Sequence, residues 1–379
     1  MDTTTNDAKV SILQISDVHF GCKDDTGEQE RILGAIDTAL EECNVPIDCV
    51  AFTGDLTQGA GYAEFQQGQE WLISVCEKVR APCILVPGNH DVRRDKADTK
   101  ILRSAYQDRE SFGRWRDHLF KEHSHIRPFL DWFAQASEEF PIFLNRWQDN
   151  PAIDAVEATL AGVPCQFICL NSALLSCAND DDPKKGQKKL CVDIKGLNGA
   201  LKNRIADKQL VIAVGHHPPD SLVGWNKDAL TKALGQATGP HLYLHGHLHH
   251  LTHKSQYESD GSGYFRGAAG ASYPGTEYPK QFSIITIELG EKQIASAVYA
   301  YHDRSGKWLP DATLSQPVPA RLPTAVSINL KVIETAEGQA PSQDWTNPFS
   351  DVIANGIPPQ YIHRLFVEPS NSLTKLRKV

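Results

Sequence analysis

Residues 10–19 read Val10-Ser11-Ile12-Leu13-Gln14-Ile15-Ser16-Asp17-Val18-His19, a short apolar run that ends in an aspartate and a histidine. Such a run predicts a buried strand. Four later runs have the same form, and each is followed by a polar motif. These runs are residues 49–52, 83–86, 210–214 and 242–244, followed by Gly54-Asp55, Gly88-Asn89-His90-Asp91, His216-His217-Pro218 and Gly246-His247-Leu248-His249. Because sites in open α/β sheets form at the carboxyl ends of strands, we expect these motifs to meet.

The residue types in these motifs predict a transition-metal site. Carboxylate, carboxamide and neutral imidazole suit Mn, Fe, Co, Ni or Zn better than Ca, and cysteine is absent from all five motifs. Two such cations about 3.5–4 Å apart can hold both the attacking and the leaving oxygen of a displacement at phosphorus. Taken singly, Asp17 could cap a helix, Asp55 could sit in a turn and Asn89 could form an Asx-turn. The ordered set of five motifs is the stronger signal.

This ordered set resembles the calcineurin-like metallophosphoesterases, from about Lys9 to about Trp308. The resemblance implies an α/β fold, a four-layer αββα sandwich of two mixed sheets. It also implies two metal ions, with Mn or Fe favoured over Zn, Co or Ni. The implied ligands of the first ion are Asp17, His19, Asp55 and His249, and those of the second are Asp55, Asn89, His216 and His247. Asp55 would therefore bridge the two ions.

The same resemblance implies catalytic roles for His90 and Asp91. His90 would face the substrate, stabilise the phosphoryl oxygens and protonate the leaving group. Asp91 would hold the tautomer of His90, since a carboxylate behind an imidazole commonly orients it. The nucleophile would be a metal-bound hydroxide attacking in line.

Three further residues are candidates for contact with the substrate. Arg93 and Arg94 follow the Asn-His-Asp motif directly and could reach a substrate phosphate or nucleotide. His217 directly follows the implied ligand His216. We therefore expect His217 to lie behind the metal ligands or in the wall of the substrate pocket. His245 and His250 flank the last motif, and the resemblance gives neither of them a role.

The order of predicted elements favours βαβ units at the start of the chain. Residues 28–43 and 62–79 carry apolar residues at helical spacing, between the first three strands. Residues 250–256, 263–267, 281–289 and 293–301 then predict four successive strands, which we expect to form a second, antiparallel-rich sheet. Residues 92–150 predict a helical cap insertion beside the site, whose aromatic residues we interpret as cap core in preference to base-stacking groups.

Residues 309–379 have a different character from the domain over residues 9–308. Nine of the 22 prolines lie between Pro310 and Pro369, which predicts an extended segment. An apolar stretch from Tyr361 to Val367 precedes a basic end. Two interpretations stay open: a strap on the chain's own core, or a segment that docks a partner or a further domain.

The composition of the 379-residue chain indicates a cytoplasmic enzyme without a membrane span or a signal peptide. Its nine cysteines are scattered, contain no Cys-x-x-Cys pair and read as reduced core thiols. The net charge of −9 argues against a general nucleic-acid surface, because binding to a polyanion depends on neutralising phosphates.

The residues of the motifs most resemble the branch that contains cyclic-nucleotide phosphodiesterases and glycerophosphodiesterases. We therefore predict a phosphodiesterase acting on cyclic nucleotides or other small phosphodiesters. The features are Ile15-Ser16-Asp17-Val18-His19, Tyr62 after Gly54-Asp55-Leu56-Thr57, and Arg93 after Gly88-Asn89-His90-Asp91. One alternative is a DNA or RNA nuclease of the same superfamily, whose glycine two residues after the first histidine is matched by Gly21. Another is a nucleotide-sensing or effector module of a larger protein.

Overall fold

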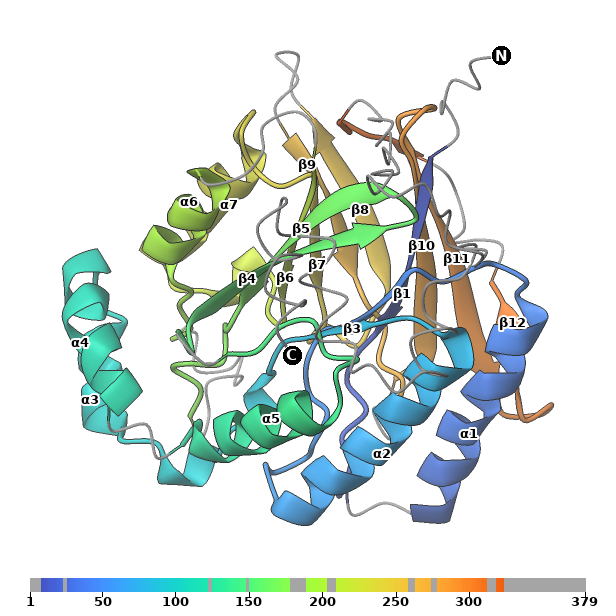
Figure 1. Ribbon diagram of the computed structural model, residues 1–379. Helices are drawn as coiled ribbons and strands as arrows, with labels where there is room; N and C mark the ends of the chain where they lie inside the picture. Colours follow the sequence, from blue (N-terminus) through green and yellow to red (C-terminus); the bar gives the residue numbers. More distant parts are fainter. Residues whose placement is uncertain are drawn as a thin grey trace, which may run out of the picture.

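The computed structural model describes residues 8–22, 26–121, 125–147, 150–177, 189–202, 209–257, 263–273, 278–311 and 318–323. Two sheets stand face to face in the middle of the molecule, with helices on both outer sides (Figure 1). This arrangement is the predicted four-layer αββα sandwich. Among these described residues, no helix is long and apolar enough to cross a membrane.

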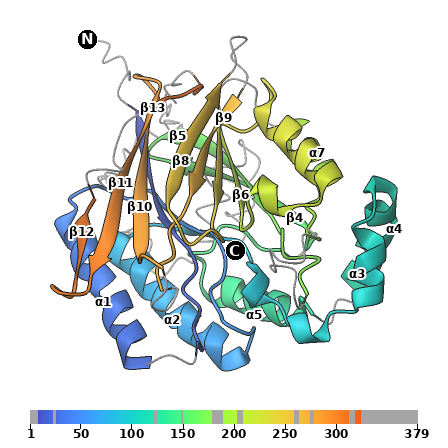
Figure 2. The same ribbon diagram turned by 180° about the vertical axis from the view of Figure 1, so that it is seen from behind.

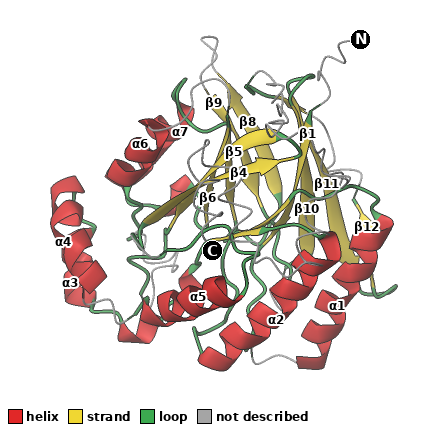
Figure 3. Cartoon of the chain, in the orientation of Figure 1, coloured by secondary structure: helices red, strands yellow, loops and turns green. Residues whose placement is uncertain are grey.

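The first sheet has the strand order β12-β11-β10-β1-β2-β3, and β13 pairs with β11. Its strands are β1 (Lys9–Ile15), β2 (Cys49–Phe52), β3 (Cys83–Leu85), β10 (Gln281–Glu288), β11 (Gln293–His302), β12 (Lys307–Pro310) and β13 (Val318–Pro319). β1 is parallel to β2 and antiparallel to β10, so the sheet is mixed. Helices α1 (Thr26–Glu42) and α2 (Tyr62–Val79) cover its outer face, and α5 (Arg127–Glu139) packs on α2 (Figure 3).

The second sheet has the order β4-β5-β6-β7-β9-β8. Its strands are β4 (Ile153–Leu160), β5 (Val163–Leu170), β6 (Leu210–Gly215), β7 (Leu242–His245), β8 (Thr252–Tyr257) and β9 (Gly263–Ala268). Along β6, Leu210, Ile212 and Val214 face the core between the sheets. Val211 and Ala213 face the layer made by α6 (Ile194–Lys202) and α7 (Gly224–Gly235). Both faces of β6 are therefore buried, which explains its unbroken apolar run.

The expectation of a separate antiparallel sheet late in the chain was wrong. The four late strands are divided between the two sheets: β8 and β9 extend the second sheet, whereas β10 and β11 pair on the open side of β1 in the first (Figure 2). Alternating apolar residues identify a strand, but they do not identify its neighbour. β10 is long and buried because it lies between two strands of the mixed sheet.

The segment expected as a cap separates into two parts. Helix α5 belongs to the main core, because Phe129 and Phe133 are buried there and Trp132 stacks on Phe65 at 4.7 Å between ring centroids. Helices α3 (Thr99–Ala105) and α4 (Arg109–Lys121) form a projecting arm. The arm is fixed to α7, since the Trp225 indole donates a hydrogen bond to the Tyr106 carbonyl at 3.0 Å.

The chain does not leave the domain at Trp308. Trp308 is buried and donates a hydrogen bond to the Ile32 carbonyl, and β12 continues to Pro310. Further on, β13 pairs with β11, Leu322 is buried, and Arg321 donates hydrogen bonds to the carbonyls of residues 237, 239 and 240. Residues 318–323 therefore pack on the core as a strap. The apolar stretch after Tyr361 lies outside the described residues.

Candidate metal centre

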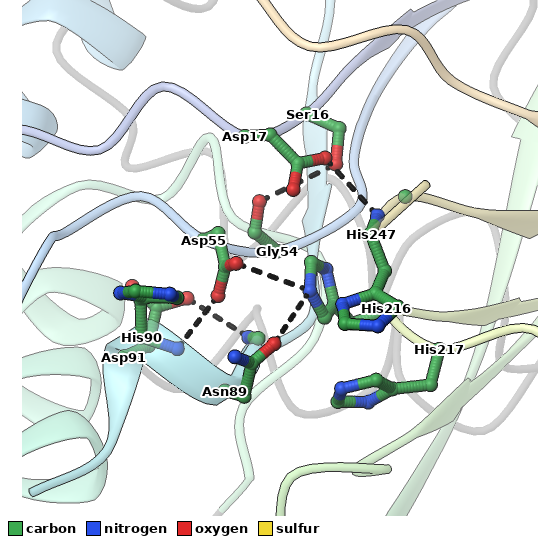
Figure 4. Close-up of polar contacts among 12 residues, drawn as sticks. Ser16, Asp17, Gly54, Asp55, Asn89, His90, Asp91, His216, His217 and His247 are labelled. Carbon is green, nitrogen blue, oxygen red and sulfur yellow. Dashed lines mark hydrogen bonds and ion pairs between the residues drawn. The ribbon is translucent and has the colours of Figure 1, made fainter. Parts of the chain in front are cut away.

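The five predicted motifs meet where the carboxyl ends of the strands from both sheets come together (Figure 4). The first sheet supplies the turns after β1, β2 and β3, and the second sheet supplies those after β6 and β7. These turns carry Asp17, His19, Asp55, Asn89, His216, His247 and His249. Side chains more than 200 residues apart are thereby brought within contact.

Five of these residues have left-handed backbone conformations. Their φ angles are 54° at Asp17, 57° at His19, 56° at Asp55, 70° at His247 and 54° at His249. Non-glycine residues rarely adopt this region, and such strain concentrates at functional sites. These backbone conformations direct the side chains into the centre. Their cost in conformational free energy must be offset by the surrounding structure.

One group of ligands gathers around Asp17. Its Oδ1 lies 3.2 Å from His249 Nε2 and 3.9 Å from His19 Nε2. Its Oδ2 accepts a hydrogen bond from the backbone N–H of His247 at 3.2 Å. Asp17, His19 and His249 each bring a potential ligand atom within 4.8 Å of the others.

A second group gathers around His216. Its Nε2 lies 3.2 Å from Asp55 Oδ2 and 3.1 Å from Asn89 Oδ1. Its Nδ1 is 2.8 Å from the carbonyl of Thr53. Because a carbonyl can only accept, Nδ1 carries a proton and Nε2 faces the centre. The His247 ring completes this side, with its centroid 5.3 Å from that of His216.

Asp55 lies between the two groups. Its Oδ2 is 3.2 Å from His216 Nε2 and 3.8 Å from His19 Nε2, while its Oδ1 accepts the His90 N–H at 2.7 Å. Glycine makes this position possible, because a Cβ on Gly88 would lie 2.1 Å from Asp55 Oδ1. A Cβ on Gly54, whose φ is +100°, would lie 2.5 Å from His216 Nδ1. The glycines of both motifs are therefore required by close approach.

His90 lies beside the centre, partly exposed, with its ring 4.7 Å from that of His19. Its Nδ1 is 2.8 Å from the carbonyl of Gln58, so Nδ1 carries the proton and Nε2 is left to exchange one.

The tautomer role expected of Asp91 is not what the structure shows. Oδ1 of Asp91 accepts hydrogen bonds from the N–H and hydroxyl of Thr57, and Oδ2 accepts from the N–H groups of Leu56 and Gly88. This buried carboxylate ties the turn after β2 to the turn after β3. The Gln58 carbonyl holds the His90 ring instead.

The two arginines differ in placement. Arg93 forms a two-pronged ion pair with Asp95, at 2.9 Å for each nitrogen. Arg94 Nη2 lies 3.2 Å and 3.3 Å from the two ring nitrogens of His90. One nitrogen in the plane of the ring cannot lie this close to both ring nitrogens, so this guanidinium rests against the ring face. Arg94 is thus beside the centre, whereas Arg93 is occupied elsewhere.

Three further histidines lie in or beside the motifs, and two of them, His217 and His245, are buried. His217 is fully buried, with its ring 4.4 Å from that of His247 and its Nδ1 2.8 Å from the Ser172 hydroxyl. His245 donates from Nδ1 to the Gly246 carbonyl and accepts from Arg266 at Nε2, 2.9 Å in both cases. His250 lies near Tyr278, at 5.6 Å between ring centroids.

A family model for calcineurin-like phosphoesterases matches residues 10–251. The chain belongs to this family. The description of the family is that of a phosphoesterase. The matched region spans β1 to the last histidine motif, so it contains the whole candidate centre.

Two curated relatives are similar to parts of the chain. An uncharacterized metallophosphoesterase-like protein, YydB of Bacillus subtilis, is 24% identical over 79% of this chain and 61% of its own length. The 3′,5′-cyclic adenosine monophosphate phosphodiesterase CpdA of Escherichia coli is 34% identical over 22% of this chain and 31% of its own length. The chain thus spans less than two thirds of both relatives. Among solved structures, a purple acid phosphatase from yellow lupin has a TM-score of 0.47 at 12% identity, over 80% of this chain and 53% of that one.

The residues of the centre fit a pair of metal ions. Within the described part of the chain, Asp17 Oδ1 and both ring nitrogens of His19 are buried and have no hydrogen-bond partner. Buried polar atoms normally have partners, so these atoms indicate a ligand that satisfies them. The carboxylate, amide and imidazole donor set is the kind that holds Mn, Fe, Zn, Co or Ni.

The charges in the centre agree with this fit. Burial acts to raise the pKa of Asp17, but the close His249 side chain and the charge of His216 outweigh it and lower the pKa to about 2. Burial acts to lower the pKa of His216, but the charge of Asp55 raises it to about 10. His216 therefore carries a proton where a cation would sit, and metal binding would release that proton.

Two contacts had no signal in the sequence. Gln29 of α1 donates to the Val18 carbonyl at 2.7 Å and so holds the first motif from outside it. Ser172, after β5, accepts the His217 N–H at 3.1 Å and contacts the ring of that histidine. Neither residue lies in a motif.

Proposed function

We propose that the protein is a two-metal phosphodiesterase acting on small phosphodiesters, including cyclic nucleotides. In this proposal the first ion is held by Asp17, His19, Asp55 and His249, and the second by Asp55, Asn89, His216 and His247. Mn or Fe are the favoured ions. When bound, the two ions would activate water at neutral pH and offset the charge on the phosphoryl oxygens.

The position of His90 carries the proposal. A phosphodiester with an alkyl or ribose leaving group needs a proton on its departing oxygen, and a positioned histidine supplies it. The Gln58 carbonyl fixes the proton on Nδ1, so Nε2 takes and gives the exchanged proton. The N–H of His90 is bonded to Asp55, which ties the acid to the centre.

The position of Arg94 also supports a phosphodiesterase. Its guanidinium rests against the His90 ring and is half-buried, so it lies where a phosphoryl oxygen would approach. Guanidinium groups bind such oxygens through charge-assisted hydrogen bonds. Arg93, paired with Asp95, is a weaker candidate. His217 is a further candidate for a substrate contact, because its buried Nε2 has no partner among the described residues.

Adenosine 3′,5′-cyclic monophosphate is the first substrate to try, because the Escherichia coli relative is named for it. The test is a hydrolysis panel with Mn: this nucleotide, bis(p-nitrophenyl) phosphate, a glycerophosphodiester, single-stranded DNA and, as a monoester, p-nitrophenyl phosphate. Cleavage of the small diesters with loss after chelation supports the proposal. Cleavage of p-nitrophenyl phosphate with none of the diesters hydrolysed would refute it.

A nuclease is the second candidate, and one observation favours it. Residues 93–116, which lead from His90 into the projecting arm, contain eight Lys or Arg residues and four Asp or Glu residues. This local excess contrasts with the net charge of −9 of the whole chain. Efficient cleavage of DNA with slow cleavage of the small diesters would make the nuclease the better account.

A further inference from the structure

Large apolar side chains are rarely exposed on the described surface, and two of the three gather at the metal centre. The three are Tyr62, Leu248 and Tyr278, with exposed fractions of 63%, 39% and 37%. Leu248 lies between His247 and His249 in the chain, and Tyr278 touches the His249 ring. Scattered exposed apolar residues need no explanation, but an exposed ring in contact with a residue of the centre is available to a ligand there.

Tyr278 reaches the centre from the loop before β10. Its ring meets the His249 ring edge to face, with centroids 4.7 Å apart and planes at 84°. It meets His250 at 5.6 Å and 74°. More than a third of the tyrosine stays open to solvent, so the ring can contact a ligand while it contacts His249.

Tyr278 is also the last member of a series of neighbouring rings. The His90 ring lies 4.7 Å from the His19 ring, and the His19 ring lies 5.7 Å from the His249 ring. Two rings therefore separate the proposed acid, His90, from Tyr278. A leaving group that takes its proton from His90 lies beside the first ring of this series, whereas Tyr278 contacts the last histidine ring.

We propose that Tyr278 is a specificity-determining residue whose ring stacks on a planar group, a nucleobase or an aryl ring, carried by the retained side of the phosphodiester. This inference rests on the proposed phosphodiesterase function. Bases stack on aromatic side chains without regard to sequence, because every base has a π-face. The centre would then prefer nucleoside diesters over alkyl diesters of equal reactivity.

The test compares two diesters with the same leaving group. Thymidine 5′-(p-nitrophenyl phosphate) and methyl p-nitrophenyl phosphate both release p-nitrophenolate, and only the retained group differs. Each is assayed with the full-length chain loaded with Mn, as wild type, Tyr278→Leu and Tyr278→Phe. A matched control is Tyr62→Leu, which removes the other exposed tyrosine, whose hydroxyl accepts a hydrogen bond from Gln66.

We expect Tyr278→Leu to raise KM for the thymidine ester about 5- to 100-fold more than for the methyl ester, the range that loss of one base stack gives. Tyr278→Phe keeps the ring and should keep the wild-type ratio of the two KM values. Tyr62→Leu should also keep it. Bound Mn, measured on each purified variant, should stay at the wild-type level.

Equal losses on the two esters would overturn the inference, whether or not Mn is lost, because Tyr278 would then act by holding His249. Should wild type hydrolyse neither ester, the proposed function fails and the inference is decided by binding. Calorimetric titration of the Mn-loaded protein with thymidine 5′-monophosphate and with methyl phosphate gives the preference directly. A nucleotide preference that Tyr278→Leu removes supports stacking, and an absent or unchanged preference refutes it.

Discussion

Asp55 is the residue on which both halves of the centre depend. Its two oxygens contact His90, His19 and His216, and it is almost fully buried. We expect Asp55→Asn to abolish diesterase activity and to lower bound metal to one equivalent or less, because a neutral amide cannot bridge two cations as a carboxylate does. Metal analysis of the purified variant, beside an activity assay, checks this.

A matched control is Asp48→Asn. Asp48 is a half-buried carboxylate that accepts the Ser11 N–H at 2.7 Å, away from the centre. This variant should keep two equivalents of metal and wild-type activity, with a modest loss of stability. Two equivalents of metal and full turnover in Asp55→Asn would show that the bridge lies elsewhere.

His90 is expected to matter in proportion to the leaving group. General acid help is typically worth about 10²–10⁴-fold, and p-nitrophenolate needs little of it. His90→Ala should therefore lose far more rate on a cyclic nucleotide than on bis(p-nitrophenyl) phosphate, with both metals retained. Parallel rate measurements on the two substrates test this. Equal losses at unchanged metal content would mean that His90 acts by holding the phosphoryl group.

Side-chain chemistry predicted which residues could bind metal, but it did not predict the hydrogen bonds that Asp91 accepts. The acidic residue after His90 suggested an imidazole partner, whereas its oxygens satisfy amides of two neighbouring turns. That role depends on the distance between the turns, which the chain order does not contain. Tyr278 and Ser172 were missed for the same reason, since each reaches the centre from a loop without a motif.

At the scale of elements, the strand-end turns leave almost no free space. We expect Gly88→Ala to displace Asp55, because the added Cβ would lie 2.1 Å from its Oδ1 and 2.5 Å from its backbone nitrogen. Metal content and activity should fall together. Gly199→Ala is the control, since a Cβ at this position in α6 meets nothing within 4 Å. It should be neutral or stabilising by about 0.4–1 kcal/mol. Thermal unfolding and metal analysis compare the two, and intact metal binding in Gly88→Ala would contradict the crowding.

The elements themselves were predictable where their apolar pattern was strong, as in β1, β6, α1 and α2. Strand partners were not, because β10 carries the same alternation whether it pairs with β1 or with another late strand. The boundary of the arm also escaped prediction. The aromatics of α5 have the spacing of any amphipathic helix, and contacts with other elements, such as the Phe65–Trp132 stack, assign them to the main core.

At the scale of the whole molecule, the centre exists only where the two sheets meet. Asp17, His19, Asp55 and Asn89 come from one sheet, and the three remaining histidines come from the other. Segments that fix the position of one sheet relative to the other therefore help to hold the metal ligands together. The strap over residues 318–323 is one such segment, since β13 pairs with the first sheet while Arg321 contacts the turn before β7.

The strap predicts different outcomes for two truncations. A chain that ends at Pro323 keeps β13, Arg321 and the buried Leu322, so it should stay soluble and active with a wild-type metal content. A chain that ends at Pro310 loses all three. Burial of one leucine is worth about 1.5–3 kcal/mol, so its melting temperature should fall by several degrees. Thermal unfolding of both chains, with Arg321→Ala in the full-length protein, provides the measurement. Equal melting temperatures for the two truncations would mean that residues 318–323 add nothing to the stability of the core. An insoluble chain ending at Pro323 would assign the strap role to the residues after it.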